Sequence, residues 1–199
     1  MSVGRLARET TYDRDRGVIV VNVRHLTREE LDAGLDAIRN SPKDEGVVEL
    51  IVSRPQPGAR VVLDHANLDP ASGLVTDSWG MRVAEPDPAT QLTVMNARAI
   101  ALIAQHRARW PLAGDQLYVD LDLADDNLPP GTQLEIGDAV IEVSAQPHLG
   151  CGKFVHRFGV DAMKFVNSPL GRQMHLRGIN ARVLRAGAVR VGDRARKRV

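Results

Sequence analysis

The chain has 199 residues, of which 43% are apolar and 26% charged, and its net charge is +1. This composition is typical of a globular protein with enough chain to bury a core, and no apolar run is long enough to cross a membrane. The N-terminus is charged and carries no apolar signal segment. The single cysteine, Cys151, excludes an internal disulfide, so we expect a cytoplasmic protein.

The small net charge hides an uneven distribution. Residues 150–199 contain twelve Lys and Arg but two acids, whereas residues 1–149 contain fourteen Lys and Arg and twenty-three acids. A basic half suits a bound anion such as a phosphate, and the alternative is a set of solvated strand arginines with a basic tail. Aromatic residues make up only 4% of the chain and no nucleic-acid reader motif is present, so we do not expect nucleic-acid binding.

The first part of the chain predicts a strand followed by a helix. Residues 18–23 are apolar and favour a strand. Thr27, with Glu30 three residues later, predicts a capping box that begins a helix. Asn40-Ser41-Pro42 ends that helix.

A hairpin and a long loop are predicted next. Residues 47–53 and 60–63 pair around the turn-rich Pro55-Gln56-Pro57-Gly58. Residues 64–90 contain several Gly and Pro residues and predict an irregular segment. So long a loop in a compact domain is usually functional or mobile.

The second half of the chain is β-rich. Apolar residues at helical spacing from Leu92 to Ile103 predict one more helix, and the alternating residues 117–123 predict a half-buried strand. Residues 134–143 and 179–191 predict two further hairpins. Many short strands with glycine turns indicate a barrel or sandwich, decorated by three helices.

Cys151 lies between two glycines, and the residues after it predict a helix. Phe154, Phe158, Ala162 and Phe165 share one helical face. A helix N-terminus with nearby cations stabilises a thiolate, which is the nucleophilic and metal-binding form of cysteine. The alternative is that Cys151 is a small buried apolar residue.

Other candidate sites are weaker. Asp120, Asp122, Asp125 and Asp126 resemble a divalent-metal cluster, but the EF-hand glycine and glutamate are missing and the strand alternation favours a solvated face. His148 and Cys151 are only two of the four ligands that a structural zinc needs. A Cys/His catalytic pair with His148 or His156 as the base stays open. Dinucleotide, P-loop and serine-elbow motifs are absent.

Short motifs follow one another in a fixed order between residues 114 and 193. They are Gly114-Asp115, Asp120-Leu121, Asn127-Leu128-Pro129-Pro130-Gly131, Ile136-Gly137-Asp138, Pro147 leading to Cys151, Lys153-Phe154, Phe158-Gly159, Arg177-Gly178-Ile179-Asn180-Ala181-Arg182-Val183, and Gly187 to Asp193. In order and spacing they resemble the MOSC domain, which is named for the C-terminal domain of molybdenum cofactor sulfurase. The likeness is to the small stand-alone bacterial type, and a weaker likeness reaches back to about Leu68.

The resemblance implies a mainly β fold with α elaborations (α+β), as a β-barrel-like domain with about three helices. We expect residues 1–67 to form an N-terminal α/β elaboration packed on the barrel and residues 68–195 to form the MOSC domain, with its core at 114–193. Residues 196–199 are expected to be a basic tail.

The resemblance also implies a molybdenum cofactor (molybdopterin) site, with Cys151 as the catalytic residue and metal ligand. The implied activity is reduction of N-hydroxylated bases or related small molecules. In the alternative, Cys151 carries sulfur as a persulfide, or the chain delivers the cofactor to a partner enzyme. A third possibility is an interaction module with an inert thiol. The candidate cofactor-binding residues are His148, Lys153, Asn127, Arg177, Asn180 and Arg182.

Two departures from the family pattern bear on function. Many bacterial relatives carry a His- and Gly-rich stretch where this chain has Leu74–Arg82, which contains no histidine. The chain also has no pyridoxal phosphate domain, so a persulfide sulfur would come from a partner such as a cysteine desulfurase. Because no flavin or iron–sulfur motif is present, a reductase would need a separate electron donor. No membrane partner is expected.

Overall fold

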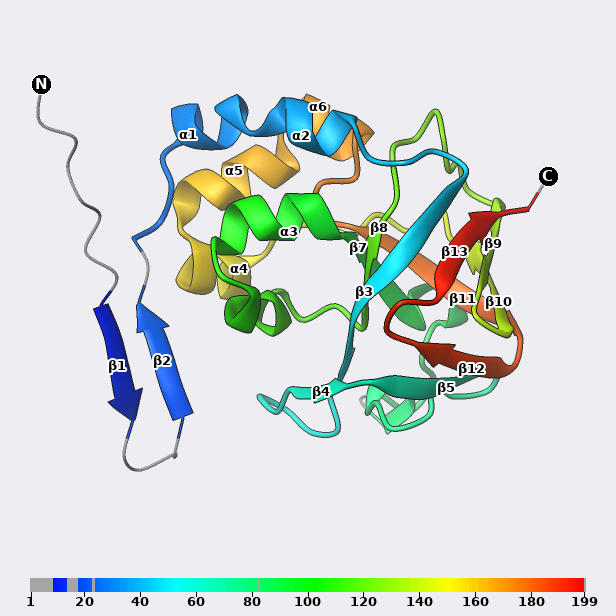
Figure 1. The fold of residues 1–199 in the computed structure, drawn as a ribbon. Coiled ribbons are helices and arrows are strands. Elements are labelled where there is room, and N and C mark those ends of the chain that lie inside the picture. The colour runs from blue at the N-terminus through cyan, green and yellow to red at the C-terminus, as the bar shows by residue number, and fades with distance from the viewer. Residues whose placement is uncertain (1–8, 14–17, 23, 82, 199) are drawn as a thin grey trace, which may run out of the picture.

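Figure 1 shows the computed structural model, which describes residues 9–13, 18–22, 24–81 and 83–198. The strands are β1 (Glu9–Asp13), β2 (Val18–Asn22), β3 (Glu45–Ser53), β4 (Val61–Leu63), β5 (His65–Asp69), β6 (Gly73–Leu74), β7 (Leu92–Asn96), β8 (Leu117–Asp120), β9 (Gln133–Ile136), β10 (Ala139–Val143), β11 (Ile179–Arg185), β12 (Gly187–Arg190) and β13 (Arg194–Lys197). The helices are α1 (Arg28–Ala33), α2 (Leu35–Arg39), α3 (Ala97–Ala104), α4 (Gly152–Phe158), α5 (Val160–Asn167) and α6 (Pro169–Gln173), with 3₁₀ turns η1 (Trp79–Met81), η2 (Pro88–Thr90) and η3 (Arg107–Ala113).

Seven strands close into a mixed barrel. Their order is β3-β8-β7-β11-β10-β9-β13, and β13 pairs with both β9 and β3, which joins the two ends of the sheet. The β7–β8 pair is parallel, and the other neighbours in the barrel are antiparallel. β4 extends the sheet beside β3, while β12, β5 and β6 form a small separate sheet. A closed barrel satisfies the backbone groups that an open sheet edge would leave unpaired.

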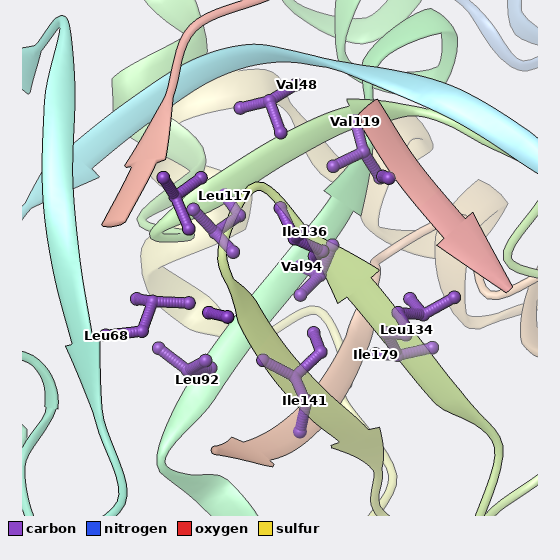
Figure 2. Close-up of a cluster of buried hydrophobic side chains, with 14 of the residues drawn as sticks. Val48, Leu68, Leu92, Val94, Leu117, Val119, Leu134, Ile136, Ile141 and Ile179 are labelled. Carbon is purple, nitrogen blue, oxygen red and sulfur yellow. The ribbon is translucent and has the colours of Figure 1, made fainter. Parts of the chain in front are cut away.

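The barrel interior is the main apolar core. Strand alternation points Val48, Val94, Leu117 and Ile141 into it, together with the further side chains in Figure 2. The opposite faces of β3, β7 and β8 pack on a second apolar cluster that the helices complete. Figure 1 shows the helices gathered on one side of the barrel. No helix in the described part of the chain is long and apolar enough to span a membrane.

Several local predictions are confirmed. The Thr27 capping box is present, because the Glu30 N–H donates to Thr27 Oγ1 at 3.3 Å and the Thr27 N–H donates to Glu30 Oε2 at 2.9 Å. β3 pairs with β4 and β9 pairs with β10, as the two hairpin predictions require. The mainly β fold class is also confirmed.

Other local predictions are wrong. Residues 92–96 form strand β7 and only residues 97–104 are helical, because Leu92 and Val94 point into the barrel and Asn96 then caps α3. β12 pairs with β5 and not with β11, so the last predicted hairpin does not form. The predicted loop 64–90 contains β5, β6 and two 3₁₀ turns.

The helices outnumber the three that we expected, because glycines divide the longer ones. Gly34 separates α1 from α2, and Gly159, with φ 91°, separates α4 from α5. The barrel also takes strands from outside the expected MOSC boundaries. β3 precedes residue 68, and the expected tail overlaps β13. The closed sheet therefore needs β3 from before residue 68 as well as β13 near the C-terminus.

Candidate functional site

Cys151 lies at the end of the loop 144–151 and is the N-cap residue of α4. The thiol is exposed, and the backbone carbonyl of Cys151 accepts a hydrogen bond from the Phe154 N–H at 2.9 Å. Asn167 on α5 fixes the preceding residue, since its amide donates to the Gly150 carbonyl at 3.0 Å and accepts from the Gly150 N–H at 2.9 Å. The predicted helix directly after Cys151 is confirmed. The start of α4 and the two Asn167–Gly150 hydrogen bonds hold the backbone at Cys151 in a defined position.

The surroundings of Cys151 favour the thiolate. Partial burial raises the pKa of the thiol, but the backbone N–H groups of Phe154 and Lys153 and the charges of Arg177 and Lys153 outweigh it. The net effect is a pKa below the ordinary value. An exposed thiol of this kind is nucleophilic and can bind a soft metal.

A buried polar network lies beside the Cys151 loop, centred on Asp115. His148 Nε2 is 2.9 Å from Asp115 Oδ1, and Arg177 Nη1 donates to Asp115 Oδ2 at 2.7 Å. Burial raises the pKa of this carboxyl, but Arg177 and His148 hold it well below its usual range. Asp115 is therefore a carboxylate, and it links β8 to the Cys151 loop and to the start of β11.

Arginines surround the turn before Asp115. Gly114, with φ 91°, ends η3, and the three successive carbonyls of residues 112–114 each accept a hydrogen bond from an arginine. They accept from Arg157, Arg177 and Arg54, at 2.6, 3.0 and 2.8 Å respectively. Arg54 also forms a buried ion pair with Asp77 at 2.8 Å. Three guanidinium groups thus lie around this turn, and those of Arg54 and Arg177 are balanced by the buried carboxylates of Asp77 and Asp115.

Two cavities meet at residues 147–149. The first, which we call the Trp79 cavity, has a volume of about 510 Å³ and is lined by Arg54, Trp79, Val83, Pro86, Asp87, Thr90, Thr93, Pro147, His148, Leu149 and Asn180. The second, the His175 cavity, has a volume of about 300 Å³ and lies between residues 144–149, α6 and β11, with Arg172, His175 and Arg177 in its wall. His148 and Asn180 line both cavities. Cys151 lines neither and follows two residues after Leu149.

The structure brings some of the candidate residues together. His148, Arg177 and Asn180 all line the His175 cavity, and Lys153 is exposed in the first turn of α4. Asn127 lies elsewhere, where its amide donates to two backbone carbonyls and its oxygen accepts from Lys197 at 2.9 Å. Arg182 is exposed on β11 and pairs with Glu142 on the neighbouring strand. Asn127 and Arg182 therefore already have protein partners away from the Cys151 loop.

Sequence reasoning missed Arg54, Asp77 and Trp79 as residues of this region. Trp79 lines the Trp79 cavity and belongs to the segment in which the family pattern led us to note the missing histidines. Asp115 was present in the motif Gly114-Asp115, which was the available signal for it. The described residues contain no group of three or more His, Cys, Asp or Glu side chains that could hold a metal ion.

The comparisons with known proteins agree with this architecture. The YuaD protein from Bacillus subtilis matches with a TM-score of 0.54 and 17% identity, over 76% of this chain and 94% of that one. YiiM from Escherichia coli matches with a TM-score of 0.52 and 18% identity, over 77% of this chain and 70% of that one. YiiM from Geobacillus stearothermophilus matches with a TM-score of 0.53 and 15% identity, over 78% of this chain and 75% of that one.

These likenesses show a shared fold. No curated protein matches the chain. The family model described as the MOSC domain matches residues 87–196, which are more than half of the chain and include the Cys151 loop, Asp115 and Arg177. The chain therefore belongs to the MOSC domain family, which is associated with the molybdenum cofactor.

Proposed function

We propose that this protein binds the molybdenum cofactor and reduces N-hydroxylated bases or related small molecules, with Cys151 as the protein ligand to molybdenum. The observation that carries the proposal is the position of Cys151. An exposed thiol with a lowered pKa lies at a helix start, next to Gly150, which Asn167 holds, and two residues after the segment 147–149 that lines two cavities. A residue that served only to fill the core would be buried.

The chemistry of the residues present fits the cofactor. A thiolate is a soft ligand that suits molybdenum, and the cofactor would bring the metal together with its pterin. The pterin ends in a phosphate, for which guanidinium and ammonium groups are the natural partners. Asn180 in the wall of the Trp79 cavity and Lys153 on α4 are the groups that would hold the pterin and its phosphate.

The reaction converts an N–OH group into N–H and releases water, which consumes two electrons and two protons. When bound, the molybdenum cofactor supplies the two-electron redox chemistry, and a separate electron-transfer protein supplies the electrons. The residues of this chain bind and orient the substrate. His148, Asn180 and Thr93 offer hydrogen-bonding groups, while Trp79 and Leu149 offer apolar surface in the same cavity.

The test is the molybdenum and pterin content of protein from a host that makes the cofactor. We expect near-stoichiometric metal and pterin in the wild type and loss of the metal in Cys151→Ala. A matched control is Met81→Ala, which changes an exposed side chain two residues after Trp79 in η1. Full molybdenum content and activity in Cys151→Ala would show that the thiol is not the ligand.

The exposure of the same thiol favours a second candidate function, a carrier of sulfur or of the cofactor. A low-pKa, accessible cysteine can attack the persulfide of a cysteine desulfurase and take over its outer sulfur atom. We expect intact mass measurement to show one added sulfur in the wild type and none in Cys151→Ala after incubation with a desulfurase and cysteine. A wild type that gains no sulfur would exclude the persulfide carrier.

A further inference from the structure

His148 is held by its neighbours in a way that fixes which ring nitrogen carries the hydrogen. Its Nε2 is 2.9 Å from Asp115 Oδ1, and Asp115 is fully buried. Asp115 is a carboxylate, so both of its oxygens can only accept hydrogen bonds. The Nε2 atom of His148 must therefore be the donor.

The charge of Asp115 is already balanced before His148 is considered. Arg177 Nη1 donates to both oxygens of Asp115, at 3.0 and 2.7 Å. The other nearby guanidinium, that of Arg54, has its own buried partner in Asp77. A second positive charge on His148 would therefore be unpaired inside the protein, which is costly.

The neutral ring is favoured for the same reasons. Burial, followed by the positive charge of Arg177, lowers the pKa of His148, while the contact with Asp115 raises it, and the net effect is a lowered pKa. A neutral imidazole with its hydrogen on Nε2 has a lone pair on Nδ1. Hence Nδ1 is a hydrogen-bond acceptor at neutral pH.

The Nδ1 atom is also available to a ligand. It has no hydrogen-bond partner among the described residues, and it is not one of the fully buried side-chain atoms. His148 lines both the Trp79 cavity and the His175 cavity. A ligand group that reaches this nitrogen and carries an O–H or N–H hydrogen meets an oriented acceptor.

We propose that Nδ1 of His148 recognises the substrate by accepting the hydrogen of its N–OH group, and that Asp115 and Arg177 are positioning residues that hold the ring. The identity of the ligand rests on the proposed function. The orientation of the ring rests on the contacts of this chain alone. Acceptance of the hydrogen bond breaks no bond, so the protonation states of ligand and ring are unchanged.

Two variants separate recognition from a purely structural role. In His148→Gln the side-chain amide can still donate to Asp115 from near the former Nε2 position, but it places no acceptor at the Nδ1 position. In His148→Asn the amide lies near the former Nδ1 position and the contact with Asp115 is lost. If His148 only supports the fold, Gln replaces it well and Asn does not.

The first measurement is the ¹⁵N chemical shifts of the histidine rings at pH 7, with the His148 signal assigned by its loss in His148→Gln. We expect a protonated Nε2 and an unprotonated Nδ1. A hydrogen on Nδ1, in the other neutral tautomer or in the imidazolium, would overturn the proposal.

The second measurement is calorimetric titration of the protein, purified from a cofactor-making host, with N-hydroxyguanidine and with its O-methyl analogue. One hydrogen bond corresponds to a preference for the hydroxyl compound of about two- to tenfold. We expect this preference in the wild type and its loss in His148→Gln. An equal preference in both proteins, or binding of neither compound by the wild type, would contradict the proposal.

The molybdenum measurement keeps the two ideas apart. A protein without molybdenum that still shows the His148-dependent preference would refute the proposed reductase and leave the recognition by His148 standing. If the wild type contains molybdenum and is active, but His148→Gln still prefers the hydroxyl compound, the recognition by His148 is refuted and the proposed reductase stands.

Discussion

Arg54 and Asp77 form a buried two-point ion pair that joins two walls of the Trp79 cavity. Arg54 Nε donates to Asp77 Oδ2 at 2.8 Å, and Nη2 donates to Oδ1 at 3.1 Å. Asp77 also accepts from the Trp79 N–H at 3.0 Å, while the remaining guanidinium nitrogen of Arg54 donates to the Gly114 carbonyl. One ion pair therefore connects the end of β3, the segment that carries Trp79 and the turn before Asp115.

We expect Asp77→Ala to destabilise the protein strongly. The substitution leaves the buried Arg54 charge without its carboxylate, and breaking a buried pair in this way costs about 3–5 kcal/mol of unfolding free energy. Urea unfolding followed by circular dichroism measures it. Asp36→Ala is the control, because Asp36 pairs with Arg39 on the surface with 87% of its side chain exposed, and we expect a change within about 0.5 kcal/mol. Similar losses in both variants would mean that the buried pair contributes no more than a surface pair.

Gly178 fixes how β11 begins after Arg177. It has φ +101°, and a Cβ at this position would lie 2.4 Å from the backbone oxygen of Val94. We expect Gly178→Ala to lower the free energy of unfolding by at least about 1–3 kcal/mol through backbone strain, since β7 would also have to shift. Gly80→Ala is the matched control, because a Cβ there meets nothing within 4 Å. Thermal unfolding compares the two, and an unchanged midpoint in Gly178→Ala would show that β7 adjusts freely.

Local signals in the sequence predicted local structure well. The Thr27 capping box, the β3–β4 and β9–β10 hairpins and the helix after Cys151 each depend on residues that are neighbours in the chain. The same logic failed where a distant strand decided the outcome. Residues 187–190 follow a turn that favours a hairpin, yet they pair with β5, more than a hundred residues earlier.

The buried network of the site was beyond sequence reasoning for a related reason. His148 contacts Asp115 across 33 positions, Arg177 contacts it across 62, and Arg54 contacts Asp77 across 23. A single sequence gives no spacing rule for such pairs. The family resemblance identified Cys151, His148 and Arg177 as candidates, but it could not reveal that Arg177 is buried against Asp115. That contact required the closed barrel.

The thiol of Cys151 should react at a lower pH than an ordinary cysteine. Because its pKa is lowered, the thiolate is lost only when the pH falls through that lower value. We expect the midpoint of the iodoacetamide reaction rate to lie at a lower pH than that of a cysteine peptide measured in parallel. Lys153→Gln removes one of the charges responsible and should slow the reaction at pH 7 by up to about fivefold. Lys164→Gln, on α5, is the control. A wild-type midpoint at or above that of a cysteine peptide would remove the basis for a thiolate ligand.

His148 should make the stability of the protein depend on pH in a defined direction. Burial and Arg177 lower the pKa of His148 in the folded chain, whereas the unfolded chain titrates near about 6.5. As the pH falls, the unfolded state therefore binds the proton first. The stability that depends on the neutral ring is complete above about pH 6.5 and is lost as the pH falls from there through the folded value.

We expect the urea midpoint of the wild type to decrease as the pH is lowered from about 7.5 to about 5.5. This dependence of the midpoint on pH should be weaker in His148→Gln. Asp115 does not confuse the measurement, because its lowered pKa means that its stabilising contribution is lost only as the pH falls below the ordinary carboxyl value of about 3.9. His156→Gln, which changes an exposed histidine on α4, is the control and should keep the wild-type slope. An identical slope in wild type and His148→Gln would mean that the ring has the same pKa in the folded and unfolded chains. The Asp115–Arg177 pair would then not hold His148 in its neutral form.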